Sequence, residues 1–234
     1  MNIFTGKRIW ITGASSGLGL AFVEQLLEQG ALVIASGRNC DALHSLYQQY
    51  RPRLVVFEGD LTDPAQANQA ARRIAERWGA LDCLIINAGA CDYLSPDTSA
   101  NAIFEGIART NLDASRHCLA VAVPLLLRGS SPQIVGVLSR YSSLQLLKPN
   151  EPETAQNSLM QLFEEQRTML AEHAIDLTIV KPQRLDASHA QETVILEYWS
   201  AHTAAEVILD HLSDRQSHLL LEAMHLSTLW PLPR

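Results

Sequence analysis

The sequence predicts a doubly wound α/β fold, in which a mostly parallel sheet of about seven strands carries helices on both faces. Short apolar runs of strand length alternate along the chain with amphipathic segments of helix length. The run 81–86 is almost wholly apolar, as expected for a central parallel strand buried on both faces. A glycine-rich turn joins the first such run to the first helix. We expect residues 1–234 to form a single domain of this fold.

The elements follow from this alternation and from their end signals. Gly30 is a helix-ending signal after the first helix, and Asp63 with Pro64 suits the start of the third helix. Pro124 should kink or end the longest helix. The predicted strands are 9–11, 31–35, 54–57, 81–86, 134–139, 175–182 and 217–223, and the predicted helices are 20–29, 41–50, 64–78, 103–127, 153–172 and 192–212.

Composition limits the classes of function. The chain has 234 residues, 47% of them hydrophobic, and a formal net charge of −7. An acidic balance without a basic cluster argues against nucleic acid as a partner. The four cysteines have no metal-ligand spacing, so we expect buried reduced thiols and no metal. The first strand begins close to the N-terminus and no apolar run is long enough for a membrane span, so we expect a cytoplasmic protein without a membrane partner.

The stretch after the first strand predicts a phosphate-binding loop. It reads Thr-Gly-x-x-x-Gly-x-Gly between an apolar strand and a helix. Glycine allows a sharp turn and close approach of a pyrophosphate, while the free amides of the helix start attract its charge. We therefore expect a dinucleotide to contact this loop, at Thr12, Gly13, Ser15, Ser16, Gly17, Leu18 and Gly19.

This spacing resembles that of the short-chain dehydrogenase/reductase family, whose members have a Rossmann-type fold, and the resemblance extends over about nine-tenths of the chain. In NAD-using relatives an acidic residue stands near the position of Gly37 and binds the ribose hydroxyls. Here the acid is absent and Arg38 follows, so a 2′-phosphate can pair with the guanidinium. We predict NADP(H) in preference to NAD(H); a solvated surface arginine is the alternative interpretation of Arg38.

Further cofactor residues follow from the same resemblance. Asp60 and Leu61 match the pair that contacts adenine, although the turn that contains them also suits a helix cap. The sequence Asn87-Ala88-Gly89 resembles the family signature in which asparagine ties neighbouring strands together and small residues leave space for the cofactor. Pro182 matches the proline at the end of the sixth strand.

The catalytic positions depart from the family pattern. Ser139 falls on the catalytic serine, and Asn111 on the asparagine whose main-chain carbonyl is thought to hold a relay water. The catalytic tyrosine, thirteen residues after the serine, is replaced by Pro152, and the lysine four residues later by Gln156. Neither replacement can transfer the proton or hold the positive charge that the family mechanism needs. The threonine that holds the nicotinamide carboxamide is replaced by Ala187.

Two functional hypotheses follow. The first is an NADP(H)-binding protein with a degenerate oxidoreductase site and no conventional dehydrogenase activity, acting as a sensor or as a subunit of an assembly. The alternative is an NADPH-dependent oxidoreductase of carbonyl or alcohol substrates with a relocated proton donor, for which Tyr141 is the candidate. Tyrosine in such a loop more often packs or lies on the surface. By resemblance, the helices 103–127 and 153–172 pair subunits, so we expect a homodimer or homotetramer.

Overall fold

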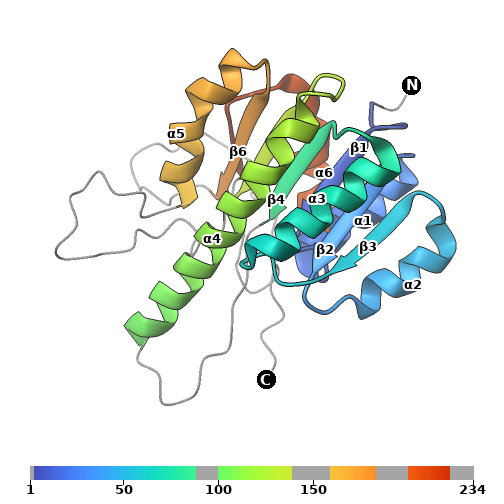
Figure 1. Cartoon of the computed structure of the whole chain (residues 1–234), viewed down its shortest axis with the longest axis horizontal. Helices are drawn as coiled ribbons and strands as arrows, with labels where there is room; N and C mark the ends of the chain where they lie inside the picture. Colours follow the sequence, from blue (N-terminus) through green and yellow to red (C-terminus); the bar gives the residue numbers. More distant parts are fainter. Residues whose placement is uncertain (1–2, 88–99, 139–158, 183–199, 222–234) are drawn as a thin grey trace.

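Seven parallel strands form one sheet in the computed structural model, which describes residues 3–87, 100–138, 159–182 and 200–221 (Figure 1). The strand order across the sheet is β3-β2-β1-β4-β5-β6-β7, and every neighbouring pair runs parallel. The predicted fold class is confirmed. The strands are β1 (Arg8–Thr12), β2 (Leu32–Gly37), β3 (Leu54–Glu58), β4 (Cys83–Asn87), β5 (Gln133–Val137), β6 (Asp176–Pro182) and β7 (His218–Leu221).

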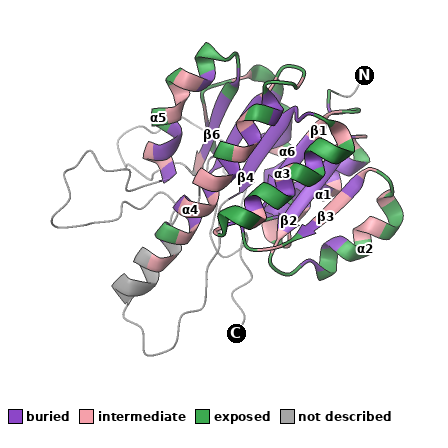
Figure 2. Cartoon of the chain, in the orientation of Figure 1, coloured by how far each residue is buried: buried purple, intermediate pink, exposed green. Residues whose placement is uncertain are grey.

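Helices cover both faces of the sheet, and each face has its own apolar core. The helices α1, α2 and α6 pack over one face, and α3, α4 and α5 pack over the other, in front of the sheet in Figure 1. Figure 2 shows the strands buried between these layers while the outer faces of α2 and α3 are exposed. The helices are α1 (Gly17–Glu28), α2 (Asp41–Tyr50), α3 (Pro64–Trp78), α4 (Ala100–Leu126), α5 (Leu159–Glu172) and α6 (Ala201–His211).

Some element ends differ from the sequence prediction. The first helix was expected from residue 20 but begins at Gly17, directly after the N-cap residue Ser16. Pro124 lies inside α4, and the helix continues to Leu126, so the proline neither ends the helix where it stands nor prevents a further half turn. The predicted cap is confirmed at Asp63, whose Oδ1 accepts a hydrogen bond from the amide of Ala65 at 2.8 Å.

The topology determines where a ligand can bind. The strand order reverses direction between β1 and β4, which lie side by side at the centre of the sheet. In open α/β sheets the crevice at the carboxyl ends of the strands beside such a reversal is the usual ligand site. Three segments meet at these carboxyl ends: the loop after Thr12, the end of β2 at Gly37 and the end of β4 at Asn87.

Within the described residues, no helix is long and apolar enough to cross a membrane.

At the amino-terminal ends of the strands, an ion pair with a buried carboxylate joins β1 to the start of β4. Arg8 at the start of β1 donates to both carboxylate oxygens of Asp82, at 2.8 and 2.7 Å, and the amide of Ser130 donates to the same carboxylate at 2.6 Å. The Asp82 side chain is 4% exposed. Burial alone would raise the pKa of the Asp82 carboxyl, but these hydrogen bonds and the charge of Arg8 outweigh burial and hold the pKa below its ordinary value.

We expect Asp82→Asn to lower the free energy of unfolding by about 3 kcal/mol, the lower end of the range for breaking a buried ion pair, because Arg8 keeps partial contact with water. Since the folded pKa of Asp82 is depressed, its contribution is fully present above the unfolded pKa and is lost as the pH falls through the folded pKa. Urea denaturation as a function of pH measures both effects.

The exposed pair Arg215–Asp176, with a separation of 3.1 Å, provides the control. Asp176→Asn should change the free energy of unfolding by less than about 1 kcal/mol. Equal effects of the two substitutions would show that the Asp82 pair does not hold β1 and β4 together.

Candidate functional site

The loop after β1 leads into the N-terminus of α1 at the carboxyl ends of the strands. Thr12 ends β1 with its side chain buried, and Gly13 and Gly17 take positive φ values of 60° and 53°. Ser16 stands at the N-cap of α1 without a side-chain capping bond, and the first turn of the helix has no acidic residue. The first amides of a helix have no partner within it, so this terminus favours an anion such as a pyrophosphate.

Asn87, the last residue of β4, clamps this loop. Its amide donates to Thr12 Oγ1 at 3.2 Å and its side-chain Nδ2 donates to the carbonyl oxygen of Gly13 at 3.1 Å. The Asn87 side chain is buried. The structure therefore ties β4 to the loop after β1, which is the structural role that the sequence predicted for this asparagine.

Two glycines are required by the closeness of this contact. A Cβ atom on Gly13 would lie 2.3 Å from the carbonyl oxygen of Asn87. A Cβ atom on Gly19 would lie 2.1 Å from the carbonyl oxygen of Gly13 and 2.8 Å from Asn87 Nδ2. Any side chain at either position would separate α1 or the loop from β4.

The end of β2 lies against the same loop. The amide of Ala14 donates to the carbonyl of Ser36 at 2.9 Å, and the indole of Trp10 donates to the Ser36 hydroxyl at 2.7 Å inside the core. Gly37 ends the strand, and the exposed Arg38 follows it. Arg38 thus lies at the carboxyl end of β2, next to the loop, where the sequence predicted the ribose contact.

The turn after β3 has a preformed shape. The amide of Asp60 donates to Gln66 Oε1 at 2.7 Å, and Asp60 Oδ1 accepts from the amide and hydroxyl of Thr62. Leu61 is buried, and its carbonyl lies 3.2 Å from Nδ1 of His117 on α4. The predicted adenine-contacting pair therefore lies on a turn that is held from both α3 and α4.

Asn111 lies in the interior of α4, and its side chain is buried. Its main-chain carbonyl accepts a hydrogen bond of 2.7 Å from the hydroxyl of Ser115, which is also buried. The helix runs through both residues without interruption, so the carbonyl also lies within the ordinary ladder of helix hydrogen bonds. No pattern of residue types in the sequence indicates this use of Ser115.

The other catalytic positions lie outside the described residues. They are the predicted serine Ser139, the candidate proton donor Tyr141, and Pro152 and Gln156 at the replaced positions. Two cofactor positions, Ala88 and Gly89, and also Ala187 and Cys91 lie outside the described residues as well. Pro182, the last residue of β6, pairs with Leu221 of β7. The described part of the site is therefore the half that would hold the pyrophosphate, the ribose and the adenine.

The described cysteines do not contribute a reactive thiol. Cys40, Cys83 and Cys118 are buried and free, as the sequence predicted. Burial raises the pKa of the Cys40 thiol to about 11 and those of Cys83 and Cys118 to about 12. These thiols stay protonated at neutral pH, and within the described residues no group of three or more His, Cys, Asp or Glu could hold a metal.

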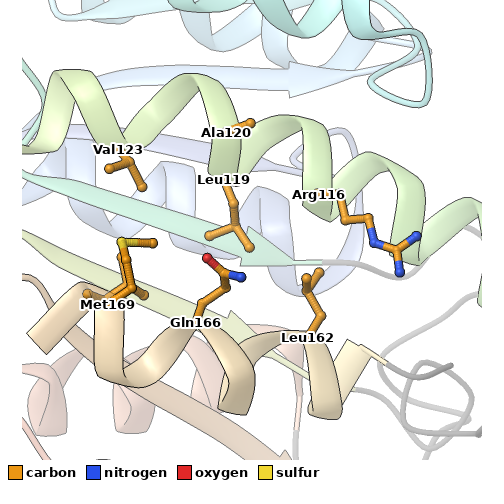
Figure 3. A pocket seen from close by; sticks show the side chains of 8 residues that line it. Arg116, Leu119, Ala120, Val123, Leu162, Gln166 and Met169 are labelled. Carbon is orange, nitrogen blue, oxygen red and sulfur yellow. The ribbon is translucent and has the colours of Figure 1, made fainter. Parts of the chain in front are cut away.

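A groove runs between α4 and α5 (Figure 3). Apolar side chains from both helices face one another along it, with Arg116 and Gln166 among them. The sequence predicted these two helices as the subunit-pairing elements. The lining residues are Arg116, Leu119, Ala120, Val123, Leu162, Gln166, Met169 and Leu170.

Comparison with known proteins places these features in a family. The family model described as short chain dehydrogenase matches residues 7–195. A cis-2,3-dihydrobiphenyl-2,3-diol dehydrogenase of Paraburkholderia xenovorans is 31% identical over 126 residues, which are 52% of this chain and 46% of that protein. The match thus spans less than half of that relative's length.

Solved structures share the fold across nearly the whole chain. A short chain dehydrogenase/reductase from Burkholderia phymatum in complex with NAD has a TM-score of 0.72 at 21% identity, covering 94% of this chain and 90% of that one. A metagenomic short-chain oxidoreductase in complex with NADP has a TM-score of 0.68 at 20% identity, covering 95% and 99%. At these identities the likeness shows the fold.

We expect Gly19→Val and Gly13→Val to abolish dinucleotide binding, because a branched side chain would push apart the loop, α1 and Asn87. Titration of NADPH measures this loss, and circular dichroism shows whether each variant is folded. Gly6→Val is the control, since Gly6 also has a positive φ of 74° but no atom within 4 Å of an added Cβ. A folded Gly19→Val protein that binds at wild-type strength would remove the loop from the site.

Proposed function

Because the chain belongs to the short-chain dehydrogenase family, we propose that it binds NADP(H) at the carboxyl edge of its sheet but lacks the family's conventional oxidoreductase chemistry. The observation that carries this proposal is the contrast between two halves of one site. In the described half a glycine loop leads into the N-terminus of α1, which favours an anion, while Pro152 and Gln156 stand where the resembled mechanism has a tyrosine and a lysine.

The preference for NADP(H) is supported at the end of β2. A 2′-phosphate carries negative charge, and Arg38 is the exposed cation that directly follows the strand. Glycine precedes it, so no carboxylate at position 37 opposes the phosphate or takes the ribose hydroxyls. Relatives bind both forms of the cofactor, since one structure is a complex with NAD and the other a complex with NADP.

The absence of conventional chemistry is supported by α4 as well as by the missing side chains. In the resembled mechanism a relay water needs the main-chain carbonyl at the position of Asn111. Here the Ser115 hydroxyl donates to that carbonyl at 2.7 Å, and the helix hydrogen bond uses its other lone pair. The relay then lacks its acid, because Pro152 replaces the tyrosine, and its cation, because Gln156 replaces the lysine. It also lacks a free acceptor for the water, because the carbonyl of Asn111 is already used.

The second candidate is an NADPH-dependent oxidoreductase with Tyr141 as proton donor, acting on a carbonyl or alcohol substrate. It is favoured by the tyrosine's position two residues after Ser139 in the sequence. The relative from Paraburkholderia xenovorans is a dehydrogenase of a cyclic diol, which indicates the class of alcohol to include in an assay panel.

We also propose that the chain assembles as a homodimer or homotetramer through α4 and α5. The groove between these helices is lined mainly by apolar side chains. Leu119, Leu162 and Leu170 are already buried in the protomer, and a second copy would cover the surface that Ala120, Val123 and Met169 keep exposed or partly exposed. In a sensor or assembly subunit, this face would be the contact through which cofactor binding affects the partner.

Arg38→Asp should reverse the cofactor preference. Loss of a charge-assisted phosphate contact of about 1.5–3 kcal/mol corresponds to about ten- to a hundredfold weaker NADPH binding. Calorimetric titration of both cofactors measures this, and Arg128→Asp, an exposed arginine just after α4, controls for net charge. Equal wild-type affinities for NADPH and NADH would refute the role of Arg38.

Wild-type protein should show no carbonyl reduction by a tyrosine–lysine mechanism. General acid catalysis contributes about 10²–10⁴-fold, so turnover should lie far below that of an ordinary relative. Pro152→Tyr combined with Gln156→Lys should restore a part of it, limited by Ala187 and by the occupied carbonyl of Asn111. The assay uses ketones, aldehydes and alcohols, and includes Tyr141→Phe. Wild-type turnover that disappears in Tyr141→Phe would establish the second candidate instead.

Sedimentation velocity should give a dimer or tetramer, and Ala120→Glu should shift it toward monomer. Ala120 lines the groove and is exposed in the protomer, so a glutamate there should not disturb folding. Ala65→Glu places the same charge on an exposed alanine of α3 and should leave the assembly intact. A monomeric wild type, or equal effects of both variants, would exclude this face.

A further inference from the structure

A side chain at position 37 would crowd Ser15 of the phosphate loop. A Cβ atom built on Gly37 would lie 2.9 Å from the Cβ of Ser15, 3.1 Å from its Oγ and 3.4 Å from its amide nitrogen. The φ angle of Gly37 is not in the left-handed region that favours glycine. The glycine is therefore explained by the space that Ser15 occupies and not by the shape of the backbone.

Neither side of this contact is free to move away. The phosphate loop is fixed to β2 by the hydrogen bond from the amide of Ala14 to the carbonyl of Ser36, one residue before Gly37. The carbonyl of Gly37 in turn accepts from the amide of Gly59 at 2.9 Å, which holds the strand end to β3. The hydroxyl of Ser36 also accepts a hydrogen bond from the buried indole of Trp10. A larger residue at 37 would have to shift the loop or the strand end against these links.

We propose that Ser15 is a specificity-determining residue, because it excludes any side chain at position 37 and with it a carboxylate that would bind the ribose hydroxyls. This leaves Arg38 as the charged group at that end of β2. The cofactor preference then depends on a pair of positions, one in the phosphate loop and one at the strand end. The inference rests on the proposed binding of NADP(H) and adds the residue that enforces the choice.

A double-mutant cycle at positions 15 and 37 tests the inference. Ser15→Gly removes the two nearest atoms and leaves the amide nitrogen at 3.4 Å, an ordinary van der Waals distance. Gly37→Asp alone should lower the melting temperature and weaken NADPH binding at least about tenfold without a gain in NADH binding. The double variant Ser15→Gly, Gly37→Asp should recover the melting temperature and bind NADH at least about tenfold more tightly than Gly37→Asp alone.

Gly37→Ala separates the effect of an added Cβ atom from the effect of an added carboxylate, because alanine has only the Cβ atom. It should lower the melting temperature as Gly37→Asp does, and Ser15→Gly should restore it in the same way. A single Gly37→Asp variant that is as stable as the double variant and binds NADH equally well would overturn the inference. A double variant that recovers neither property would also overturn it, because contacts other than Ser15 would then close position 37.

The failure of this inference is distinguishable from that of the proposed function. A wild-type protein that binds neither dinucleotide contradicts the proposed function, whereas the melting temperatures of the four variants still report whether Ser15 and Gly37 are coupled. Additive melting-temperature effects across the cycle would contradict the coupling even where NADPH binds as proposed.

Discussion

The close approach of Asn87, Gly13 and Gly19 is the constraint on which the rest of the site depends. The end of β4, the turn after β1 and the first turn of α1 come so near one another that side chains at the two glycines would overlap backbone atoms. Asn87 uses this closeness to bind both Thr12 and the carbonyl of Gly13. The loop is thereby rigid before any ligand arrives, and its amides need not be ordered when an anion binds.

This rigidity extends outward from the loop to the neighbouring strands. Ala14 bonds to the end of β2, Gly59 bonds to the same strand end from the β3 side, and Gln66 holds the turn at Asp60. Three successive strand ends are thus joined into one edge that can contact pyrophosphate, ribose and adenine. The departures from the resembled family pattern are in the sequence at Pro152, Gln156 and Ala187. This contrast is why we propose a chain that holds the cofactor without using it in the conventional way.

Much of the fold and of the phosphate loop could be predicted from the sequence, because both depend on local patterns. The apolar runs locate the strands, and the spacing of Gly13, Gly17 and Gly19 indicates the loop between β1 and α1. The start of α1 at Gly17 was not predicted, since glycine has a low helix propensity. The presence of Gly19 inside the helix is explained only by its close contact with Gly13 and Asn87.

The side-chain pairings within the site could not be predicted. The contact between Ser15 and Gly37 joins the loop after β1 to the end of β2, and the hydrogen bond from Ser115 to the carbonyl of Asn111 leaves no mark in the pattern of residue types. In the resembled pattern, Pro152 and Gln156 stand at the positions of the tyrosine and the lysine, and the proposal of lost chemistry rests on these two positions. A single-turnover experiment tests it most directly: protein in excess over NADPH is mixed with a panel of carbonyl substrates, while energy transfer from tryptophan and the absorbance of the reduced nicotinamide are followed together. We predict energy transfer to bound NADPH and a reduced-nicotinamide absorbance that persists. Lack of energy transfer, or loss of that absorbance within one turnover, would contradict the account.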